Sequence, residues 1–428
     1  MQISSFYGRL IIKHNIDVTA YPALEMMPAI KDNVCQRCFN TLDQQWQLPN
    51  GIRYCGLCLK FGRITTADTL VTIPEPNMFP SFSNWQWGGV LTRSQQRVVN
   101  EIKKHTHNHL VWAVTGAGKT EILFPIIAQA LISNQRICIA APRIDVILEL
   151  VPRITVVFPT IPIAVLYGQN KEPYRYTQLV ICTTHQLLHF RAAFDLLIID
   201  EVDSFPFAGN QLLKNAPQTA LKLTGRLIVM TATPTRKHLM TFKQRSYLPA
   251  RFHGYPLPKI ETKVVNKWRI LIKNRQLPIC LKSYFEQNNQ GYQCLVFVPT
   301  IHDVTTVTAA IHQQFPDVKL EGVFAQDPER MNKVQLMRNR EIQYLVTTTI
   351  LERGVTLPDI DVIILGADHH NFNSRTLIQI AGRVGRKTSR PTGMVLAIMS
   401  TPSWQVLVAQ MTIKWLNYQA TKGDKDDL

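Results

Sequence analysis

Two series of short apolar runs, separated by longer segments of helical pattern, dominate the sequence. The runs are rich in β-branched residues and lack polar alternation, so they predict strands buried on both faces of parallel sheets. Strands are expected at 110–114, 137–140, 179–182, 195–199 and 226–230 in the first series, and at 294–298, 344–347, 362–365 and 393–398 in the second. A helix is expected over 121–132. The pattern predicts an α/β fold with two parallel-sheet units.

Shifts in composition divide the chain into three parts. Residues 1–86 hold four closely paired cysteines and a proline-rich connector from Ile73 to Pro80. A second proline-rich crossing begins at Leu248, between the two series of strands. We therefore expect an N-terminal cysteine domain with its linker over 1–86, one α/β domain over 87–250 and another over 251–428. Two such domains joined by a short linker leave a cleft for a ligand that both grip.

Charge narrows the choice of partners. The 428 residues include 47 lysines and arginines against 30 aspartates and glutamates, for a formal net charge of +17 and a pI near 9.6. This excess favours a polyanionic partner, either nucleic acid or an anionic membrane surface. No apolar run approaches the roughly 18 residues of a membrane span, and the first residues lack the apolar core of a signal peptide. A cytoplasmic protein without a transmembrane segment is expected.

A phosphate-binding loop is indicated where the run at 110–114 meets the helical pattern. The stretch Ala113-Val-Thr-Gly-Ala-Gly-Lys-Thr120 lies between a strand and a helix, as a P-loop requires. Backbone N–H groups from Gly116 to Gly118 can converge on a phosphate, and the helix dipole favours its charge. Lys119 would reach the β- and γ-phosphates, and the Thr120 hydroxyl would ligate Mg²⁺. The alternative is a glycine-rich turn between core elements.

Acidic residues follow a later strand of the same series. Asp200-Glu-Val-Asp203 ends the run at 195–199, and ligand sites concentrate at the carboxyl ends of parallel strands. Asp200 would hold Mg²⁺, and Glu201 would orient or deprotonate an attacking water. An ordinary helix N-terminus is the alternative for such an acidic cluster. Thr231-Ala-Thr-Pro ends the next strand, where its hydroxyls could link the acidic site to the second domain.

The second series of strands is followed by a pair of arginines. Gln379-Ile-Ala-Gly-Arg-Val-Gly-Arg386 places Arg383 and Arg386 three residues apart, on one face if the segment is helical. A guanidinium aimed across a cleft at a γ-phosphate is how an arginine finger stabilises phosphoryl transfer. The stretch 347–356 also follows a strand, and its threonines offer hydroxyls to a phosphate backbone.

The N-terminal cysteines have the spacing of a zinc site. Cys35 and Cys38 form one C-x₂-C pair, Cys55 and Cys58 form another, and sixteen residues separate the pairs. Four thiolates close a tetrahedral shell around one Zn²⁺ and leave no position for water, so a structural metal is expected. Gly56 suits the tight turn of the second pair. An iron–sulfur cluster or two disulfides are the alternatives.

The motifs stand in the order and spacing of superfamily 2 helicases and translocases, which the chain resembles over residues 87–400. The resemblance rests on Gln95 and on the segments 113–120, 200–203, 231–233, 295–300, 347–356 and 379–386. Within that superfamily, the cysteine module and the form of the last motif look most like the ComFA family of late competence proteins. The resemblance implies two RecA-like parallel-sheet lobes preceded by a small four-cysteine zinc domain.

The same resemblance implies roles for individual residues. Gln95 would read the adenine edge, because its amide offers one donor and one acceptor side. The remaining nucleotide contacts would come from Thr115, Gly116, Ala117, Gly118, Lys119 and Thr120. Catalysis would involve Lys119, Asp200, Glu201, Gln379, Arg383 and Arg386. Pro142, Arg143, Thr183, Thr184 and Thr348 match positions that hold the nucleic-acid strand in the superfamily.

The implied function is ATP-dependent movement along single-stranded DNA, in support of DNA uptake at the inner face of the bacterial membrane. ATP, Mg²⁺ and Zn²⁺ would be the cofactors, and a membrane DNA channel and a phosphoribosyltransferase-like companion would be partners. A replication-restart or RNA helicase is the alternative enzyme, although restart helicases of the PriA kind usually carry their cysteines between the lobes. A non-catalytic nucleic-acid-binding scaffold is the alternative from another class.

Overall fold

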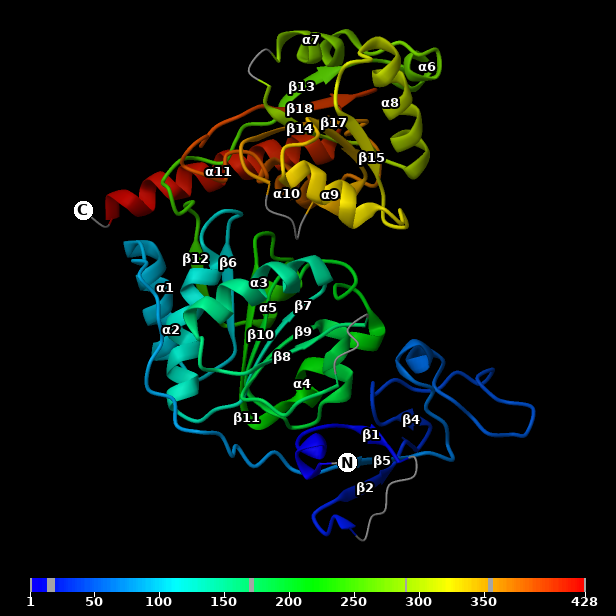
Figure 1. Ribbon diagram of the computed structural model, residues 1–428, viewed down its shortest axis with the longest axis vertical. Coiled ribbons are helices and arrows are strands. Elements are labelled where there is room, and N and C mark those ends of the chain that lie inside the picture. The colour runs from blue at the N-terminus through cyan, green and yellow to red at the C-terminus, as the bar shows by residue number, and fades with distance from the viewer. Residues whose placement is uncertain (1, 14–19, 169–172, 289–290, 353–356, 427–428) are drawn as a thin grey trace. The chain divides into compact units, whose positions relative to one another are not determined.

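The computed structural model describes residues 2–13, 20–168, 173–288, 291–352 and 357–426. The chain forms two compact units (Figure 1). Unit 1 comprises Met1–Trp112 and Lys119–Tyr247, and unit 2 comprises Ala113–Gly118 and Leu248–Leu428. Each unit is built on one extended sheet flanked by helices.

The sheet of unit 1 has seven strands. In spatial order they are β12 (Gln244–Leu248), β6 (His109–Ala113), β11 (Leu221–Thr231), β10 (Phe194–Ile199), β7 (Ile137–Ala141), β9 (Leu179–Thr183) and β8 (Ile163–Leu166). The pairs from β6 to β8 are parallel. Strands β7 and β9 are buried over their whole length, because helices cover a parallel sheet on both faces.

Five helices belong to unit 1, within the residues described. They are α1 (Arg93–Lys104), α2 (Lys119–Ile132), α3 (Ile144–Val157), α4 (Ala216–Ala220) and α5 (Arg236–Thr241). Helix α3 packs on β7, β8 and β9, and α2 lies between α1 and α3. A short 3₁₀ helix, η4 (Thr184–His189), follows β9 directly. Helices α2 and α3 therefore begin at the carboxyl edge of the sheet, where the predicted site residues lie.

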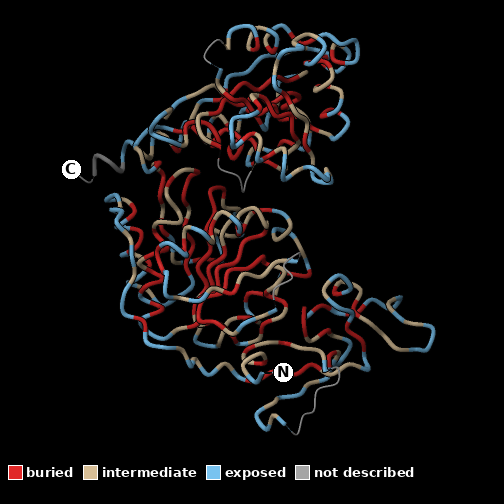
Figure 2. The backbone as a smooth tube through the Cα atoms, in the orientation of Figure 1, coloured by how far each residue is buried: buried red, intermediate tan, exposed pale blue. Residues whose placement is uncertain are grey.

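The sheet of unit 2 has six strands, all parallel to their neighbours. In spatial order they are β13 (Glu261–Val264), β18 (Val395–Met399), β17 (Ile360–Leu365), β14 (Gln293–Phe297), β16 (Tyr344–Thr347) and β15 (Leu320–Val323). Figure 2 shows the buried central strands of both sheets, whereas β13 at one edge is exposed at every residue. The predicted α/β class with two parallel sheets is confirmed.

The helices of unit 2 cover its sheet and end the chain. They are α6 (Trp268–Lys273), α7 (Ile279–Gln287), α8 (Ile301–Gln314), α9 (Arg330–Arg338), α10 (Ser374–Ala381) and α11 (Trp404–Asp426). Helix α8 packs on β15 and β16, and α10 packs on α11. Helix α8 begins with a capping box, in which Thr300 and Asp303 satisfy each other's backbone N–H groups. Across the residues described, no helix has the length and apolarity needed to cross a bilayer.

The N-terminal residues share the hydrophobic core of unit 1. They form a small antiparallel sheet of β1 (Ile11–Ile12), β5 (Thr69–Thr72) and β2 (Glu25–Pro28), and a hairpin of β3 (Ile30–Lys31) and β4 (Val34–Cys35). The four paired cysteines belong to one buried cluster with the side chains of Leu187 and Phe190 beside the large sheet. The cysteine module is therefore packed against the first lobe.

A buried ion pair anchors the proline-rich connector to unit 1. Glu75 in the connector pairs with Arg136 just before β7, and both side chains are fully buried. The Tyr176 hydroxyl also donates to Glu75, and burial raises the pKa of this phenol. Two residues further on, Asn77 donates to the Asp195 carboxylate over 2.9 Å. These contacts stabilise the connector against the amino edge of the large sheet.

Candidate nucleotide site and metal site

The P-loop connects β6 to α2, as the sequence predicts. Gly116 and Gly118 have φ values of +80° and +75°, which glycine adopts without the steric cost of a Cβ. Lys119 is the first residue of α2, and its Nζ lies 3.9 Å from Asp200 Oδ1. Both side chains are 18 % exposed. The lysine and the aspartate predicted to handle phosphate and metal are thus neighbours.

The acidic motif is held at the end of β10 by backbone and side-chain contacts. The Asp200 N–H donates to the Ala140 carbonyl oxygen on β7, and Asp200 Oδ1 accepts the Glu201 N–H over 2.8 Å. Glu201 itself has a φ of +52°, a left-handed conformation that is uncommon outside glycine. Such backbone conformations cluster at functional sites, where the surrounding structure enforces them.

Asp203 joins the acidic motif to the threonines that follow β11. Its Oδ1 accepts the Thr231 hydroxyl and its Oδ2 accepts the Thr233 hydroxyl, each over 2.5 Å. Thr231 and Thr233 are 0 % and 7 % exposed, so these bonds are shielded from water. The threonines therefore bind the acidic motif directly.

The structure gives Gln95 a local role at the start of α1. Its Oε1 accepts the Thr92 backbone N–H over 2.9 Å, and the Thr92 hydroxyl oxygen accepts the Gln95 N–H over 3.2 Å. This reciprocal pair is a capping box. Gln95 is only 3 % exposed. The amide oxygen is thus engaged in the cap at the start of α1.

The predicted strand-contact residues follow the carboxyl ends of their strands. Pro142 and Arg143 follow β7, Thr183 and Thr184 lie where β9 meets η4, and Thr348 follows β16 in unit 2. Thr184 is fully buried, whereas Arg143 and Thr348 are partly exposed. Thr184 is thus not on the surface of unit 1. The end of the 347–356 motif, residues 353–356, lies outside the described residues.

The arginines of unit 2 do not lie on one helical face. Helix α10 carries the buried Gln379 and ends at Ala381, so Arg383 and Arg386 lie in the turn that follows. Gly382 and Gly385 explain this end, because glycine weakens a helix and Gly385 has a φ of +68°. Arg383 is 2 % exposed, and its Nε donates to the Glu352 carbonyl oxygen over 3.0 Å.

Arg251, which follows β12, contacts this turn, and sequence reasoning missed it. The residue is 3 % exposed, and its guanidinium donates to the carbonyl oxygens of Val384 and Gly385, each over 2.7 Å. Burial, with Arg386 nearby, lowers the pKa of Arg251 to about 10, which still leaves it charged at neutral pH. A cation at a helix C-terminus stabilises the exposed carbonyl dipoles. Arg251 belongs to no motif, so nothing in the sequence marked it.

The four paired cysteines converge on one point. Their Sγ atoms all lie within 4.8 Å of one another, and all four side chains are buried. Cys35 and Cys58 are 3.9 Å apart and Cys38 and Cys55 are 3.7 Å apart, close to the ~3.8 Å edge of a tetrahedron with 2.3 Å zinc–sulfur bonds. Disulfides need about 2.05 Å, so this arrangement is not a pair of disulfides. The donor set fits Zn²⁺.

Gly56 and Arg37 complete the cysteine module, and the reason for Gly56 differs from the expectation. Gly56 does not need a positive φ; instead, a Cβ there would lie 2.5 Å from the indole of Trp46. The reason for glycine is therefore close packing and not the turn itself. Arg37 is buried, and its NH1 donates to the carbonyl oxygens of Phe61 and Gly62 over 2.7 and 3.0 Å. It thereby ties the first cysteine pair to the segment after the second.

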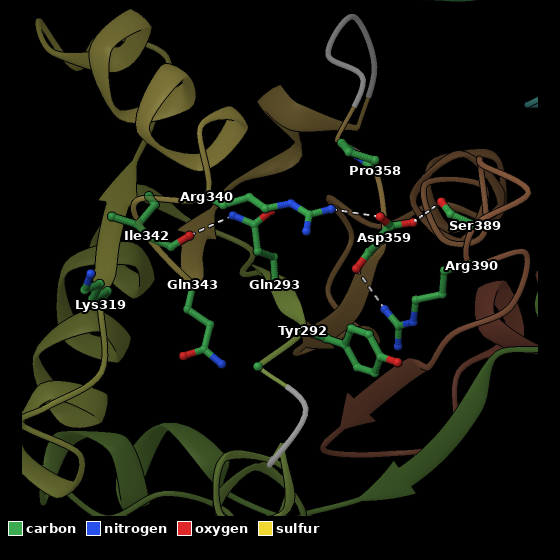
Figure 3. A pocket seen from close by; sticks show the side chains of 11 residues that line it. Tyr292, Gln293, Lys319, Arg340, Ile342, Gln343, Pro358, Asp359, Ser389 and Arg390 are labelled. Atoms are coloured by element: carbon green, nitrogen blue, oxygen red, sulfur yellow. Dashed lines mark hydrogen bonds and ion pairs between the residues drawn. The ribbon is translucent and has the colours of Figure 1, made fainter.

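A separate cavity of about 430 Å³ lies in unit 2, at the amino ends of its strands (Figure 3). Arg340 donates to Asp359 Oδ2 over 2.9 Å across this cavity, and the Arg390 guanidinium lies 3.5 Å from the centre of the Tyr292 ring. Thr348 follows the opposite, carboxyl end of β16. None of the predicted site residues lines this cavity, so it is distinct from the predicted nucleotide site.

Comparisons with known proteins agree with the two-lobed arrangement. The family described as "Helicase conserved C-terminal domain" matches residues 273–388, and "Type III restriction enzyme, res subunit" matches residues 90–236. The solved DEAD-box helicase Mss116 bound to ssRNA and UDP-BeF has a TM-score of 0.57 at 18% identity, covering 72% of this chain and 69% of that one. The structure of Saccharomyces cerevisiae Dbp5 bound to RNA and ADP BeF3 has a TM-score of 0.56 at 14% identity, covering 76% and 87%. At this identity the likeness shows the fold.

Full-length relatives are more specific. Competence protein ComFA of Streptococcus pneumoniae (strain ATCC BAA-255 / R6) is 39% identical over 430 residues, covering 97% of this chain and 98% of the relative. Competence protein ComFA of Bacillus subtilis (strain 168) is 36% identical over 411 residues, covering 92% and 87%. The helicase families and the full-length relatives together identify an ATP-hydrolysing enzyme of the helicase type. This chain belongs to the ComFA family of competence proteins, within helicase superfamily 2.

Proposed function

We propose that this chain is an ATP-driven translocase on single-stranded DNA that supports the uptake of transforming DNA in bacterial competence. The relatives that match it over almost their full length are named competence proteins, and its two lobes match helicase families. The structural observation that carries the proposal is the 3.9 Å approach of the Lys119 ammonium to the Asp200 carboxylate at the end of the P-loop.

The donor set at this edge fits a magnesium nucleotide. Lys119 supplies a cation for the phosphates, and Thr120 and Asp200 supply the hydroxyl and carboxylate oxygens that Mg²⁺ prefers. Bound Mg²⁺ would neutralise charge on the phosphates during hydrolysis. Glu201, next to Asp200, would orient or deprotonate the attacking water. The P-loop amides from Thr115 to Gly118 bind the phosphates.

The remaining predicted residues have supporting roles in this proposal. Gln95 reads adenine, while Gln379, Arg383 and Arg386 act from the second lobe, where the two arginines sense the γ-phosphate. Strand contacts come from Pro142, Arg143, Thr183, Thr184 and Thr348, with backbone contacts the expected mode at the buried Thr184. One zinc ion binds Cys35, Cys38, Cys55 and Cys58 and stabilises the N-terminal module. The lobes correspond to domains 87–250 and 251–428, after the 1–86 module.

The partners follow from the family. Single-stranded DNA is the proposed substrate, and a membrane DNA channel and a phosphoribosyltransferase-like companion are the proposed competence partners. The protein would work in the cytoplasm, peripheral to the inner face of the membrane. A restart or RNA helicase is less favoured, because the full-length relatives are competence proteins and the cysteine module precedes both lobes. A non-catalytic scaffold is disfavoured by the presence of Lys119, Glu201 and Arg386 together.

A turnover assay with and without nucleic acid tests this function. We expect single-stranded DNA to stimulate ATP hydrolysis more than RNA of the same length does. Lys119→Ala should lower stimulated turnover by at least ~100-fold, because it removes a cation that stabilises the transferred phosphoryl group. Binding of DNA in the absence of nucleotide should change little. The exposed Lys104→Ala on α1 is the matched control, expected to behave like wild type.

Two results would contradict the proposal. Undiminished hydrolysis by Lys119→Ala would remove the P-loop from the mechanism. Equal stimulation by RNA and DNA would favour the RNA-helicase alternative.

A further inference from the structure

Arg153 contacts the residue that is proposed to ligate magnesium. It lies on α3, one helix away from the P-loop helix α2, and belongs to no motif. Its NH1 donates to the Thr120 hydroxyl oxygen over 2.9 Å. Its NH2 pairs with the carboxylate of Glu121, the next residue of α2. One guanidinium thus binds two consecutive side chains at the start of the P-loop helix.

This contact and magnesium make competing demands on Thr120. A hydroxyl oxygen has two lone pairs, and Arg153 engages one of them. A divalent ion on the same oxygen would lie beside a positive guanidinium, and the two cations repel. Glu121 offsets part of this repulsion, because its carboxylate neutralises Arg153. The side chains of Arg153 and Glu121 are 40 % and 31 % exposed, so the guanidinium has room to leave Thr120 while it stays paired with Glu121.

We propose that Arg153 is a positioning residue for the metal in the nucleotide site: it holds the Thr120 hydroxyl when no metal is bound and releases it, onto Glu121, when Mg²⁺ binds. This inference rests on the proposed nucleotide site at the P-loop and adds to it. Without metal, Arg153 at the Thr120 hydroxyl supplies a cation for an anionic nucleotide, in addition to that of Lys119. The positive charge of Arg153 opposes the binding of Mg²⁺, and the negative charge of Glu121 favours it.

The two partners of this ion pair should therefore have opposite effects on magnesium. Binding of a fluorescent ADP analogue to the full-length protein would be measured across a Mg²⁺ titration and in EDTA. The Mg²⁺ midpoint is the Mg²⁺ concentration at which binding of the analogue has changed by half. We expect Arg153→Gln to lower this midpoint by about two- to fivefold, the range of a partly exposed ion pair. Glu121→Gln should raise it by a similar factor. In EDTA, Arg153→Gln should weaken binding of the ADP analogue by about two- to fivefold. The same variant thus makes the site better for Mg²⁺ and worse for the metal-free nucleotide.

Two controls separate this role from a structural one. Lys282 and Glu286 form an exposed ion pair on α7, 3.7 Å apart. Lys282→Gln should leave the Mg²⁺ midpoint and the nucleotide affinity in EDTA unchanged. Thermal unfolding of each variant reports its stability independently. A variant that only loosens α2 would weaken nucleotide binding with and without metal, so it would not reverse sign.

Shifts of the Mg²⁺ midpoint in opposite directions for the two variants support the inference. Shifts in the same direction, or no shift beyond that of Lys282→Gln, overturn it while leaving the proposed function intact. A wild-type protein that binds no nucleotide under any condition overturns both this inference and the proposed nucleotide site.

Discussion

Glycine is required for two different reasons at three positions of this chain, backbone conformation at two and space for a neighbouring side chain at the third. Gly116 and Gly118 have positive φ values, so the P-loop needs them for its backbone conformation. Gly56 has no such φ, and its lack of a side chain makes room for the indole of Trp46. The sequence indicated the first requirement through a motif. It could not indicate the second, because the partner of Gly56 is set by how the chain folds back on itself.

Arg251 allows a prediction at this scale. Its two 2.7 Å hydrogen bonds hold the turn that carries Arg386. Arg251→Met removes this buried donor from the carbonyl groups of Val384 and Gly385, although Gly385 still accepts from His253 Nε2 over 3.0 Å. A lost hydrogen bond from a charged group costs about 1.5–3 kcal/mol. We expect hydrogen exchange of the amides around 382–386 to become at least ~10-fold faster, since 1.4 kcal/mol corresponds to that factor. Mass spectrometry of peptides covering this turn measures it.

A matched control is available in the same unit. Arg338 is exposed at the end of α9, and Arg338→Met should leave exchange in the turn unchanged. Exchange in Arg251→Met equal to that in wild type would show that the turn holds its conformation without this guanidinium.

At the scale of elements, buried strands were predictable and edge strands were not. The central strands β7, β9 and β10 lie within a residue or two of the predicted runs, because burial on both faces requires continuous apolar sequence. The edge strand β13 reads Glu-Thr-Lys-Val and carries no such signal. Strand β11 was expected to begin at 226 but begins at Leu221, and its pairing with β10 is irregular around Gly225. Glycine within a strand often marks such an irregularity. The apolar run used for the prediction does not extend before Gly225, so it did not indicate the first residues of the strand.

The candidate site was predictable to a similar extent. The P-loop and the acidic motif depend on local sequence and on the edge at which parallel strands end, so the approach of Lys119 to Asp200 follows from the pattern. The shared helical face of Arg383 and Arg386 was expected only if their segment were helical, and α10 ends at Ala381 before both arginines. The contacts of Arg153 and Arg251 come from packing between distant segments, and no spacing in the sequence encodes them.

The cysteine module provides a prediction for an element. Because its four thiols pack into the same core as Leu187 and Phe190, loss of the metal should destabilise unit 1 as well as the module. We expect Cys35→Ser to reduce zinc per chain and the yield of folded protein together, and to lower the unfolding temperature by several degrees, as loss of ~1 kcal/mol or more would. Elemental analysis and a thermal scan measure both.

Cys280→Ser serves as the control for this experiment. Cys280 lies on α7, outside the cluster, and is only partly buried. Its replacement should leave zinc content unchanged. Zinc content of Cys35→Ser equal to wild type would reject the metal assignment.

At the scale of the whole molecule, net charge should contribute strongly to binding of the proposed partner, single-stranded DNA. A net charge of +17 favours a polyanion, and binding to DNA releases the counterions that its phosphates hold. We expect the affinity for single-stranded DNA to fall as salt rises, with a slope in the logarithmic plot of about −0.7 for each phosphate contacted. A fluorescence-anisotropy titration across a salt series measures the slope. A slope near zero would indicate that charge contributes little to strand binding.

The buried pair between Glu75 and Arg136 sets a limit on how this enzyme can be trimmed or recombined. A chain that starts at residue 87 would keep Arg136 inside the first lobe but lose its carboxylate. An orphaned interior charge costs about 3–5 kcal/mol, a large part of the 5–15 kcal/mol that holds a typical domain together. A shortened motor of this kind should aggregate on purification, and chimaeras with other family members should exchange the leading module and the seven-stranded sheet as one block.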